Sequence, residues 1–292
     1  MIDIMKNHKV ISIMTVYYPD KSNLDNAKKI CSQSNLLIIC DNSPTSNQKL
    51  FSVLENTKYF YWGKNLGLSG AFNKVLKNDT LHWADDDYVL FFDQDSTIQP
   101  DHIKTLISEY ENLKYNGGSV GCIGPVYFNL NSNKEQIPRL KEYVNKQTMK
   151  VSSIITTSML CQYKNLKKIG FWNEEIFLDM ADWDICWRFY AANMNVYMTY
   201  VSVIRHSLGK GIKKVGPIRL SISAPFREYY QTRECLRLLF KPYVPFKYKL
   251  RFCYMLTVRP ILHMLFLDHK IERAKYIGKG LIAYFAGKNG SL

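Results

Sequence analysis

Residues 88–96 read YVLFFDQDS and carry the clearest fold signal in the chain. The uninterrupted apolar run favours a strand buried on both faces of a sheet. It leads directly into two acidic residues, Asp93 and Asp95. Carboxylates two positions apart on a rigid support suit a hard cation such as Mg²⁺ or Mn²⁺. The alternative is that one of them only caps the turn or helix that follows.

Similar apolar runs precede this stretch and alternate with helical segments. Strands are expected at residues 9–16, 35–40 and 58–62, helices at 23–30 and 100–113, and a glycine-bearing loop that runs into a helix at 65–76. This order predicts an α/β fold with a parallel sheet covered by helices on both faces. Ligands of such sheets bind at the carboxyl ends of the strands. Asp41, which follows the second strand, is therefore expected at the same edge as Asp93.

A second acidic cluster lies in FLDMADWDICWR at residues 177–188. Asp179, Asp182 and Asp184 fall near the start of a helix expected over 181–192. Aromatic neighbours make the setting partly apolar, which raises the proton affinity of a carboxylate and suits it to general-base work. The plainer interpretation is an acid-rich helix start that favours the helix dipole. In HSLGK at 206–210, His206 follows another expected strand.

The net charge of +14 resides entirely in the last part of the chain. Residues 201–292 hold 18 Lys and Arg against 4 Asp and Glu, whereas residues 1–200 hold 21 of each sign. This split argues against a uniformly basic nucleic-acid coat protein and for a neutral domain followed by a basic region. A hydrophobic content of 47% excludes a chain that is disordered throughout.

Taken together over roughly residues 9–235, these motifs resemble the inverting GT-A-fold glycosyltransferases of family 2, and within them the bacterial rhamnosyltransferase-like branch. The segments that carry the resemblance are VISIMTVYYP at 10–19, LLIICDNSP at 36–44, NLGLSGAFN at 65–73, VLFFDQDS at 89–96, IGFWNEEIFLDMADWDICWR at 169–188 and HSLGK at 206–210. The resemblance implies a Rossmann-like, mostly parallel sheet flanked by helices. It places a GT-A catalytic domain at 1–211 and a basic, aromatic helical region at 212–292.

The resemblance also implies a role for each matching residue. Asp182 aligns with the catalytic base, and Asp41 with the acidic group that hydrogen-bonds the pyrimidine of the nucleotide. The donor-binding positions are Thr15, Tyr17, Asp41, Asn65, Gly67, Asn73 and Asp93. The implied ligands of a Mg²⁺ or Mn²⁺ ion are Asp93, Asp95 and His206.

One departure from the family pattern concerns the base. The family often has Glu-Asp where this chain has Ala181 followed by Asp182. Asp182 remains the candidate, but Asp179 and Asp184 lie close enough in sequence to keep the assignment open.

The reaction implied is an inverting transfer with no covalent intermediate, in which a metal assists departure of the nucleoside diphosphate. The branch suggests dTDP-L-rhamnose as donor, although Asp41 would serve another dTDP- or UDP-sugar equally. The acceptor expected is a lipid-linked glycan or a polysaccharide of the bacterial surface.

The basic region from residue 212 onward is expected to serve the acceptor side. Arg227, Tyr230 and Arg233 recur at near-helical spacing, and Trp183 in the acidic motif is a further acceptor candidate. The plain interpretation is a helix that packs on the catalytic domain, and the functional one is docking on an anionic membrane surface or acceptor. A nucleic-acid partner is not expected.

The expected location is the cytoplasm, with the protein peripheral on the inner face of the plasma membrane. The sequence shows no signal-peptide pattern and no spanning segment, because Arg259, Pro260 and His263 interrupt the most apolar late run. Seven scattered cysteines without a CxxC pair favour a reducing compartment.

Two other classes of protein compete with a glycosyltransferase. FFDQDST also satisfies the D-x-D-x-T pattern of haloacid-dehalogenase-like phosphatases, in which Asp93 would be the nucleophile. That motif normally occupies the first strand, whereas three strands are expected before it here. A membrane-bound scaffold without activity is the second alternative, and the presence of Asp93, Asp95, Asp182 and His206 together argues against it.

Overall fold

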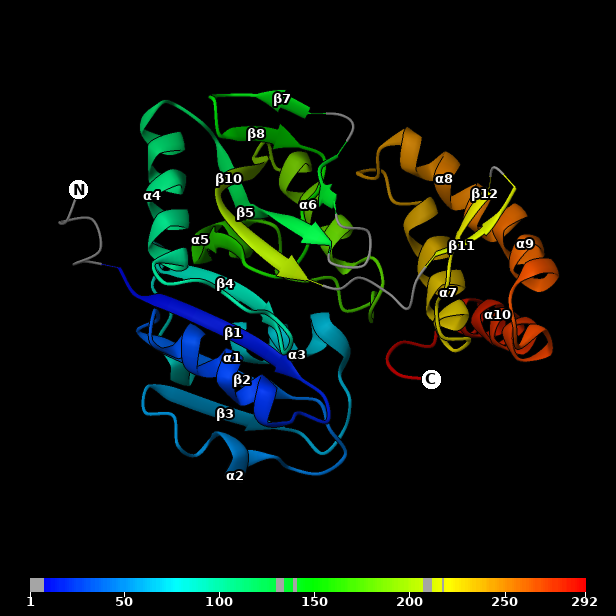
Figure 1. Ribbon diagram of the computed structural model, residues 1–292, viewed down its shortest axis with the longest axis horizontal. Coiled ribbons are helices and arrows are strands. Elements are labelled where there is room, and N and C mark those ends of the chain that lie inside the picture. The colour runs from blue at the N-terminus through cyan, green and yellow to red at the C-terminus, as the bar shows by residue number, and fades with distance from the viewer. Residues whose placement is uncertain (1–7, 130–133, 139–140, 207–211, 217) are drawn as a thin grey trace.

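The structure is a computed structural model that describes residues 8–129, 134–138, 141–206, 212–216 and 218–292. A large sheet with flanking helices forms one part of the molecule, and the C-terminal helices form a group beside it (Figure 1). The arrowheads of the parallel strands point toward that group. The carboxyl ends of the strands therefore lie where the two parts meet.

The N-terminal half follows the predicted alternation of strands and helices. Its elements are β1 (Val10–Val16), α1 (Lys21–Cys31), β2 (Leu36–Asp41), α2 (Gln48–Phe51), β3 (Thr57–Tyr61), α3 (Gly67–Leu76), the 3-10 helix η2 (Asp79–Leu81), β4 (Tyr88–Asp93) and α4 (His102–Tyr115). Strands β3, β2, β1 and β4 are adjacent in that order, and all pair in parallel. Thr15 lies beside Asp93 in the register, which brings the ends of β1 and β4 together.

The second half of the sheet is mixed rather than parallel. Its elements are β5 (Val120–Asn129), β6 (Lys134–Gln136), β7 (Lys141–Tyr143), β8 (Thr148–Val151), β9 (Met159–Gln162), α5 (Tyr163–Lys168), α6 (Ala181–Ala191) and β10 (Asn195–His206). β10 pairs with β5 in parallel, but β9 is antiparallel to β4 and β8 to β10. Residues 129–150 look like a polar surface excursion in the sequence. In the structure β8 pairs with β10 and β7 pairs with β8, and this pairing buries Thr148, Met149 and Val151.

The basic region begins with the hairpin of β11 (Ile212–Val215) and β12 (Ile218–Ser221) and continues with four helices. These are α7 (Arg227–Leu239), α8 (Phe246–Leu256), α9 (Val258–Phe266) and α10 (Lys270–Phe285). Cys235, Leu238 and Phe252 belong to the same buried cluster as the residues of the sheet and α6. The rings of Trp187 in α6 and Tyr248 in α8 lie 4.6 Å apart. The boundary at residue 211 stays a prediction, but α7 and α8 share the core of the sheet.

A buried ion cluster holds the C-terminal helices together. The Glu228 carboxylate in α7 lies 2.7 Å from His263 Nδ1 of α9 and 3.0 Å from Arg273 Nη1 of α10. Burial alone would raise the pKa of Glu228, but the hydrogen bond from His263 and the charges of Arg259 and Arg273 lower it. The carboxylate is thus held ionised at a junction of three helices.

Glu228→Gln is expected to lower the free energy of unfolding by about 3–5 kcal/mol, because it leaves Arg273 buried without its counter-charge. Urea unfolding monitored by circular dichroism measures the loss. Glu272→Gln is the matched control, since its pair with His269 is exposed and contributes about 0–1 kcal/mol. Equal losses in the two variants would contradict this account of Glu228.

No helix within the described part of the chain combines the length and apolarity needed to cross a membrane.

Candidate active site

The end of β4 opens into a cavity of about 890 Å³ at the carboxyl edge of the sheet. Six predicted residues of the donor and metal site line it together: Thr15, Tyr17, Asn65, Gly67, Asp93 and Asp95. Arg227 and Tyr230 of α7 line the same cavity from the opposite side. The structure thus brings together motifs that lie up to about 200 positions apart in the sequence.

The turn that carries the two carboxylates is held by a network from several elements. Thr157 Oγ1 donates to Asp93 Oδ2 at 2.6 Å, and the amide of Asp93 donates to Ser96 Oγ at 3.1 Å. The side chain of Gln94 accepts from the Tyr17 amide at 2.6 Å, and α1 donates two amide hydrogen bonds to the Gln94 carbonyl oxygen. The turn is therefore positioned before any ligand binds, which lowers the ordering cost of binding.

Asp93 and Asp95 fit the role of ligands to Mg²⁺ or Mn²⁺. Both are hard oxygen donors that line one cavity, and Mg²⁺ is commonly held by one or two carboxylates with phosphate and water completing its shell. Among the residues that the structure describes, no group of three His, Cys, Asp or Glu side chains forms a complete metal site. His206 ends β10, but its side chain and residues 207–211 lie outside the described part, so its role stays a prediction.

The loop at residues 65–68 requires a glycine at position 67, where it meets the acidic motif. The φ of +71° at Gly67 is in the left-handed region, and a Cβ there would lie 2.5 Å from the carbonyl oxygen of Phe177. The adjacent Leu68 amide donates to that same oxygen at 3.0 Å. Asn65 Oδ1 accepts from the Gly67 amide at 2.8 Å and shapes the turn. The loop and the acidic motif are therefore in direct contact.

Two predicted donor residues do not line this cavity. The Asp41 carboxylate is fully buried and accepts hydrogen bonds from the amides of Ser43 and Asn47 and from the Tyr59 hydroxyl. Burial alone would raise the pKa of Asp41, but these hydrogen bonds lower it. Its oxygens are committed to the loop after β2, so a direct contact with the pyrimidine does not follow from this arrangement.

Asn73 also performs a structural task. Its side chain donates to the Trp172 carbonyl oxygen at 2.8 Å and accepts from the Trp172 amide at 3.0 Å. It therefore fixes the segment that leads into the acidic motif, and its contact with a donor stays a prediction. Family motifs mark such a position, but only the fold shows which way its side chain is directed.

The three carboxylates of the acidic motif have distinct environments. Asp184 is fully buried, where it accepts from Arg188 Nε at 2.7 Å and from the Tyr243 hydroxyl at 2.6 Å. The sequence left Asp184 open as the base or as a secondary acceptor residue, but these two hydrogen bonds commit its oxygens to linking α6 with the segment after α7. Asp179 lies 3.6 Å from Arg227, and burial raises its pKa. Asp182 alone lines a second cavity.

Asp182 has the electrostatics of a general base. Burial raises its pKa to about 7, and the negative charges of Asp93 and Asp179 add to the rise, while the Trp183 amide opposes it. That amide donates to Asp182 Oδ1 at 2.8 Å and fixes the carboxylate. A base whose pKa lies near the working pH accepts a proton efficiently and is still deprotonated often enough to act.

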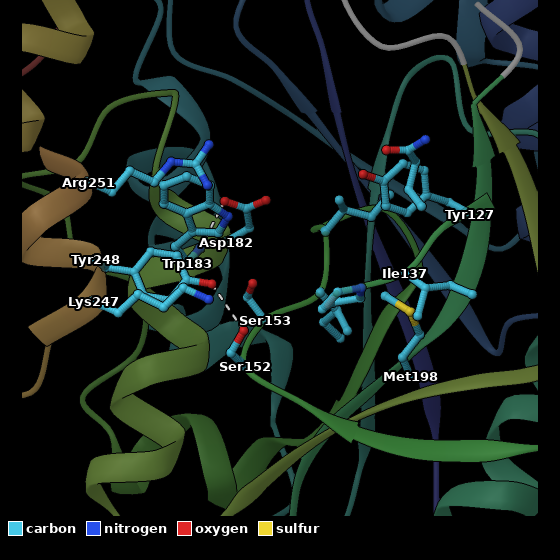
Figure 2. Close-up of a pocket in the computed structure, with 14 residues that line it drawn as sticks. Tyr127, Ile137, Ser152, Ser153, Asp182, Trp183, Met198, Lys247, Tyr248 and Arg251 are labelled. Carbon is cyan, nitrogen blue, oxygen red and sulfur yellow. Dashed lines mark hydrogen bonds between the residues drawn. The ribbon is translucent and has the colours of Figure 1, made fainter. Parts of the chain in front are cut away.

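The second cavity has a volume of about 470 Å³. Figure 2 shows Asp182, Trp183, Lys247, Tyr248 and Arg251 on one wall, and Tyr127, Ile137 and Met198 on the other. Ser152 and Ser153 lie between them, and Ser152 Oγ is 3.0 Å from the Tyr248 hydroxyl. The cavity is therefore built by the sheet, α6 and α8 together.

Helix α7 holds the backbone of the acidic motif through a buried carboxylate. The buried Glu234 carboxylate accepts from the amides of Phe177, Leu178 and Asp179 at 2.9, 3.3 and 3.1 Å. Burial and the Asp179 charge raise the pKa of Glu234 to about 7. The Tyr230 ring stacks on Phe177 with a centroid separation of 4.9 Å. The basic region thus shapes the donor side of the site.

Arg233, predicted on the acceptor side, lines neither of the two cavities. It is fully buried and donates to the Tyr229 hydroxyl at 3.0 Å and to the Gly290 carbonyl oxygen at 2.9 Å. Its guanidinium also lies 4.8 Å from the Tyr229 ring centroid. Arg233 therefore anchors the last residues of the chain on α7.

The sequence interpretation missed several residues that shape the site: Gln94, Thr157, Glu234, Lys247, Tyr248 and Arg251. Gln94 was detectable, since it lies between the two carboxylates. The others had no local signal, because each is an ordinary polar residue of a helix or loop until the fold places it.

The fold and this pair of cavities define a class of protein. The model of glycosyl transferase family 2 matches residues 12–170, more than half of the chain. The chain therefore belongs to glycosyl transferase family 2 and is a glycosyltransferase, which decides against the phosphatase and the inactive scaffold.

One particular relative extends the match to nearly the whole chain. The dTDP-rhamnosyl transferase RfbF of Shigella flexneri is 26% identical over 301 residues, which cover 97% of each protein. This similarity includes the helical region that the family model leaves out.

The fold is shared with a solved structure. GalNAc-T7, whose structure was determined with UDP, GalNAc and Mn²⁺, superposes with a TM-score of 0.56 at 10% identity. The match covers 85% of this chain and 54% of that one, so this chain spans about half of its length. Residues 1–349 of S. aureus TarS align over 94% of this chain and 80% of that one at 15% identity, with a TM-score of 0.49. The GT-A fold is the property shared with GalNAc-T7.

Proposed function

We propose that the protein is an inverting rhamnosyltransferase that transfers L-rhamnose from dTDP-L-rhamnose to a hydroxyl of a lipid-linked or polysaccharide acceptor of the bacterial surface. The observation that carries the proposal is the place of Asp182. It lines the second cavity, and its pKa responds to the charge of Asp93, which lines the first. A donor in the first cavity and an acceptor in the second would meet between these two carboxylates.

The donor cavity would bind the nucleotide sugar through its existing framework. Asp93 and Asp95 would hold Mg²⁺ or Mn²⁺ against the diphosphate, and His206 would add a ligand. The cation would supply compensation for the charge of the departing diphosphate. Thr15 and Tyr17 line this cavity on the side of β1, and Arg227 contributes a positive charge to it on the side of α7.

Asp182 would accept the proton of the attacking hydroxyl. Its Oδ1 is fixed by the Trp183 amide, and the carboxylate is directed into the second cavity (Figure 2). Attack from this side, opposite the diphosphate, inverts the anomeric centre in one displacement and needs no protein nucleophile. The walls of α6 and α8 would keep bulk water from competing with the acceptor hydroxyl.

A screen of nucleotide sugars tests the donor assignment. dTDP-L-rhamnose with Mn²⁺ is expected to raise the melting temperature more than UDP-glucose, UDP-GalNAc or GDP-mannose, because a ligand of the folded state stabilises it by mass action. Metal-dependent release of dTDP, followed by chromatography, is the second readout. Selective stabilisation by a UDP-sugar would replace rhamnose as the donor, and no stabilisation by any nucleotide sugar would overturn the proposal.

The helical region would place the enzyme on the inner face of the plasma membrane. An exposed apolar stripe runs along α8 and α9 at near-helical spacing: Phe246, Leu250, Tyr254, Val258, Ile261 and Leu265. Leu250 is 57% exposed and Ile261 is 54% exposed. Lys247, Lys249 and Arg251 adjoin the stripe, so apolar insertion and attraction to anionic lipid would act at one surface.

Leu250→Glu combined with Ile261→Glu is expected to reduce binding to phosphatidylglycerol-containing vesicles about tenfold or more. The two apolar side chains no longer insert into the lipid, and the two new negative charges are repelled by the anionic surface. Co-sedimentation with vesicles measures the change. Val53→Glu is the control, because Val53 is 66% exposed but lies between α2 and β3. Equal binding by the double variant and the wild type would contradict the assigned surface.

A further inference from the structure

The second cavity contains two cations that the mechanism does not use. Lys247 and Arg251 occupy positions i and i+4 of α8, so they project from one face of the helix. Both line the cavity that contains Asp182. In Figure 2 they flank Tyr248 and Trp183 on the wall that also carries the base.

Neither cation is committed to a carboxylate. Within the part of the chain that the structure describes, Lys247 and Arg251 form no ion pair with Asp or Glu. Arg251 instead lies 4.6 Å from the Trp183 ring centroid, an arrangement that holds the guanidinium in place while leaving its N–H groups available. Two oriented positive charges beside a catalytic carboxylate indicate a ligand that brings its own negative charge.

We propose that this cavity binds an acceptor that bears a phosphate or diphosphate group, with Lys247 and Arg251 as its ligands. The inference rests on the proposed function, because it makes this cavity the acceptor site. The Arg251 fork can bind two phosphate oxygens at once, and Lys247 adds a point charge one helical turn away. Ser152 and Ser153 provide hydroxyl groups at the base of the same cavity.

The surroundings of the two cations favour a lipid-linked source for the phosphate. Phe246 and Leu250 directly precede Lys247 and Arg251, and they are 74% and 57% exposed. A lipid chain attached to the phosphate would thus leave the cavity beside the apolar stripe of α8. A phosphorylated glycan without lipid would use the same cations but not the stripe.

Farnesyl diphosphate, inorganic pyrophosphate and farnesol separate these sources. Each is titrated into the full-length protein saturated with dTDP and Mn²⁺, so that the donor site is occupied. Calorimetry measures affinity. The chain has five Trp residues, so the part of the fluorescence change that Trp183→Phe removes is the local signal from the ring beside Arg251. Wild-type protein is expected to bind farnesyl diphosphate most tightly. Equal binding of pyrophosphate would assign the site to phosphate without lipid, and equal binding of farnesol would overturn the proposal.

Lys247→Met and Arg251→Gln are expected to weaken farnesyl diphosphate binding about tenfold each and roughly 100-fold together, because each removes one charge-assisted contact. Arg251→Lys is expected to restore part of the affinity. Lys275→Met is the control, since it removes an exposed charge from α10, away from both the cavity and the apolar stripe. All variants should bind dTDP with Mn²⁺ like the wild type.

Binding of dTDP separates failure of the proposed function from failure of the inference about Lys247 and Arg251. If wild-type protein fails to bind dTDP under any metal condition, the proposed function fails. If dTDP binds but the double variant retains wild-type affinity for farnesyl diphosphate, the inference about Lys247 and Arg251 is overturned and the donor assignment stands.

Discussion

Asp182→Asn is expected to lower kcat by about 10²–10⁴-fold, the usual contribution of general-base catalysis. The amide retains the size of the side chain and still accepts the hydrogen bond of the Trp183 amide, but it cannot take a proton from the acceptor hydroxyl. Rhamnosyl transfer assayed by mass spectrometry measures the loss. Donor affinity should change little, because Asp182 lines the other cavity.

Asp184→Asn and Asp179→Asn are the matched comparisons for this prediction. Asp184 is committed to Arg188 and Tyr243, so its variant is expected to lose stability more than chemistry. Asp179 faces Arg227 at the donor side, so its variant should alter the donor KM more than kcat. Near-wild-type turnover in Asp182→Asn, with a large loss of turnover in Asp179→Asn, would move the base to Asp179.

The pH profile provides an independent test of the same residue. Asp182 must be deprotonated to act, and burial with the charges of Asp93 and Asp179 raises its pKa to about 7. The value of kcat/KM is therefore expected to rise with pH below about 7 and to level off above it. A cation at Asp93 would offset one of these charges, so saturating Mn²⁺ should move the limb to lower pH. Asp182→Asn should lack the limb.

Asp93→Asn combined with Asp95→Asn is expected to reduce kcat/KM by roughly 100-fold or more and to abolish the metal dependence of dTDP binding. The variant keeps the shape of both side chains, and an amide oxygen at position 93 still accepts from Thr157. What is lost is the pair of negative charges that suits a divalent cation. Calorimetric titration of dTDP with and without Mn²⁺ measures the effect.

Asp101→Asn controls for the loss of negative charge near the same strand end, since Asp101 is exposed at the start of α4 and does not line the cavity. It should leave both metal dependence and turnover unchanged. If the double variant at positions 93 and 95 still binds dTDP more tightly with Mn²⁺ than without it, the metal is held elsewhere and these two carboxylates serve the donor directly.

Much of the N-terminal fold follows from local pattern. Short β-branched and apolar runs can be recognised without long-range contacts, so the strands that became β1, β2, β3 and β4 were predicted within one or two residues. The segment that contains β8 could not be recognised in this way. Its pairing with β10 depends on residues about 50 positions away, and its burial is a result of that pairing.

The residues of the candidate site were likewise predictable only in part. The motifs at 93–95 and 179–184 predict metal-binding or general-base carboxylates, because several acidic residues follow apolar ones within a short span. Their sequence does not say which carboxylate meets a substrate. Arg188 and Tyr243 occupy Asp184, whereas the contact of α8 with α6 leaves Asp182 facing a cavity.

Local sequence is enough to give the order of strands and helices in the N-terminal half, the two acidic motifs and the concentration of positive charge after residue 200. These are local properties of neighbouring residues and of their composition. The packing of the helices on the sheet, by contrast, brings the basic region into the candidate site: Glu234 binds the backbone of the acidic motif, and Lys247 and Arg251 line the same cavity as Asp182. Such contacts join residues about 55 to 70 positions apart, and they exist only once the helices pack on the sheet.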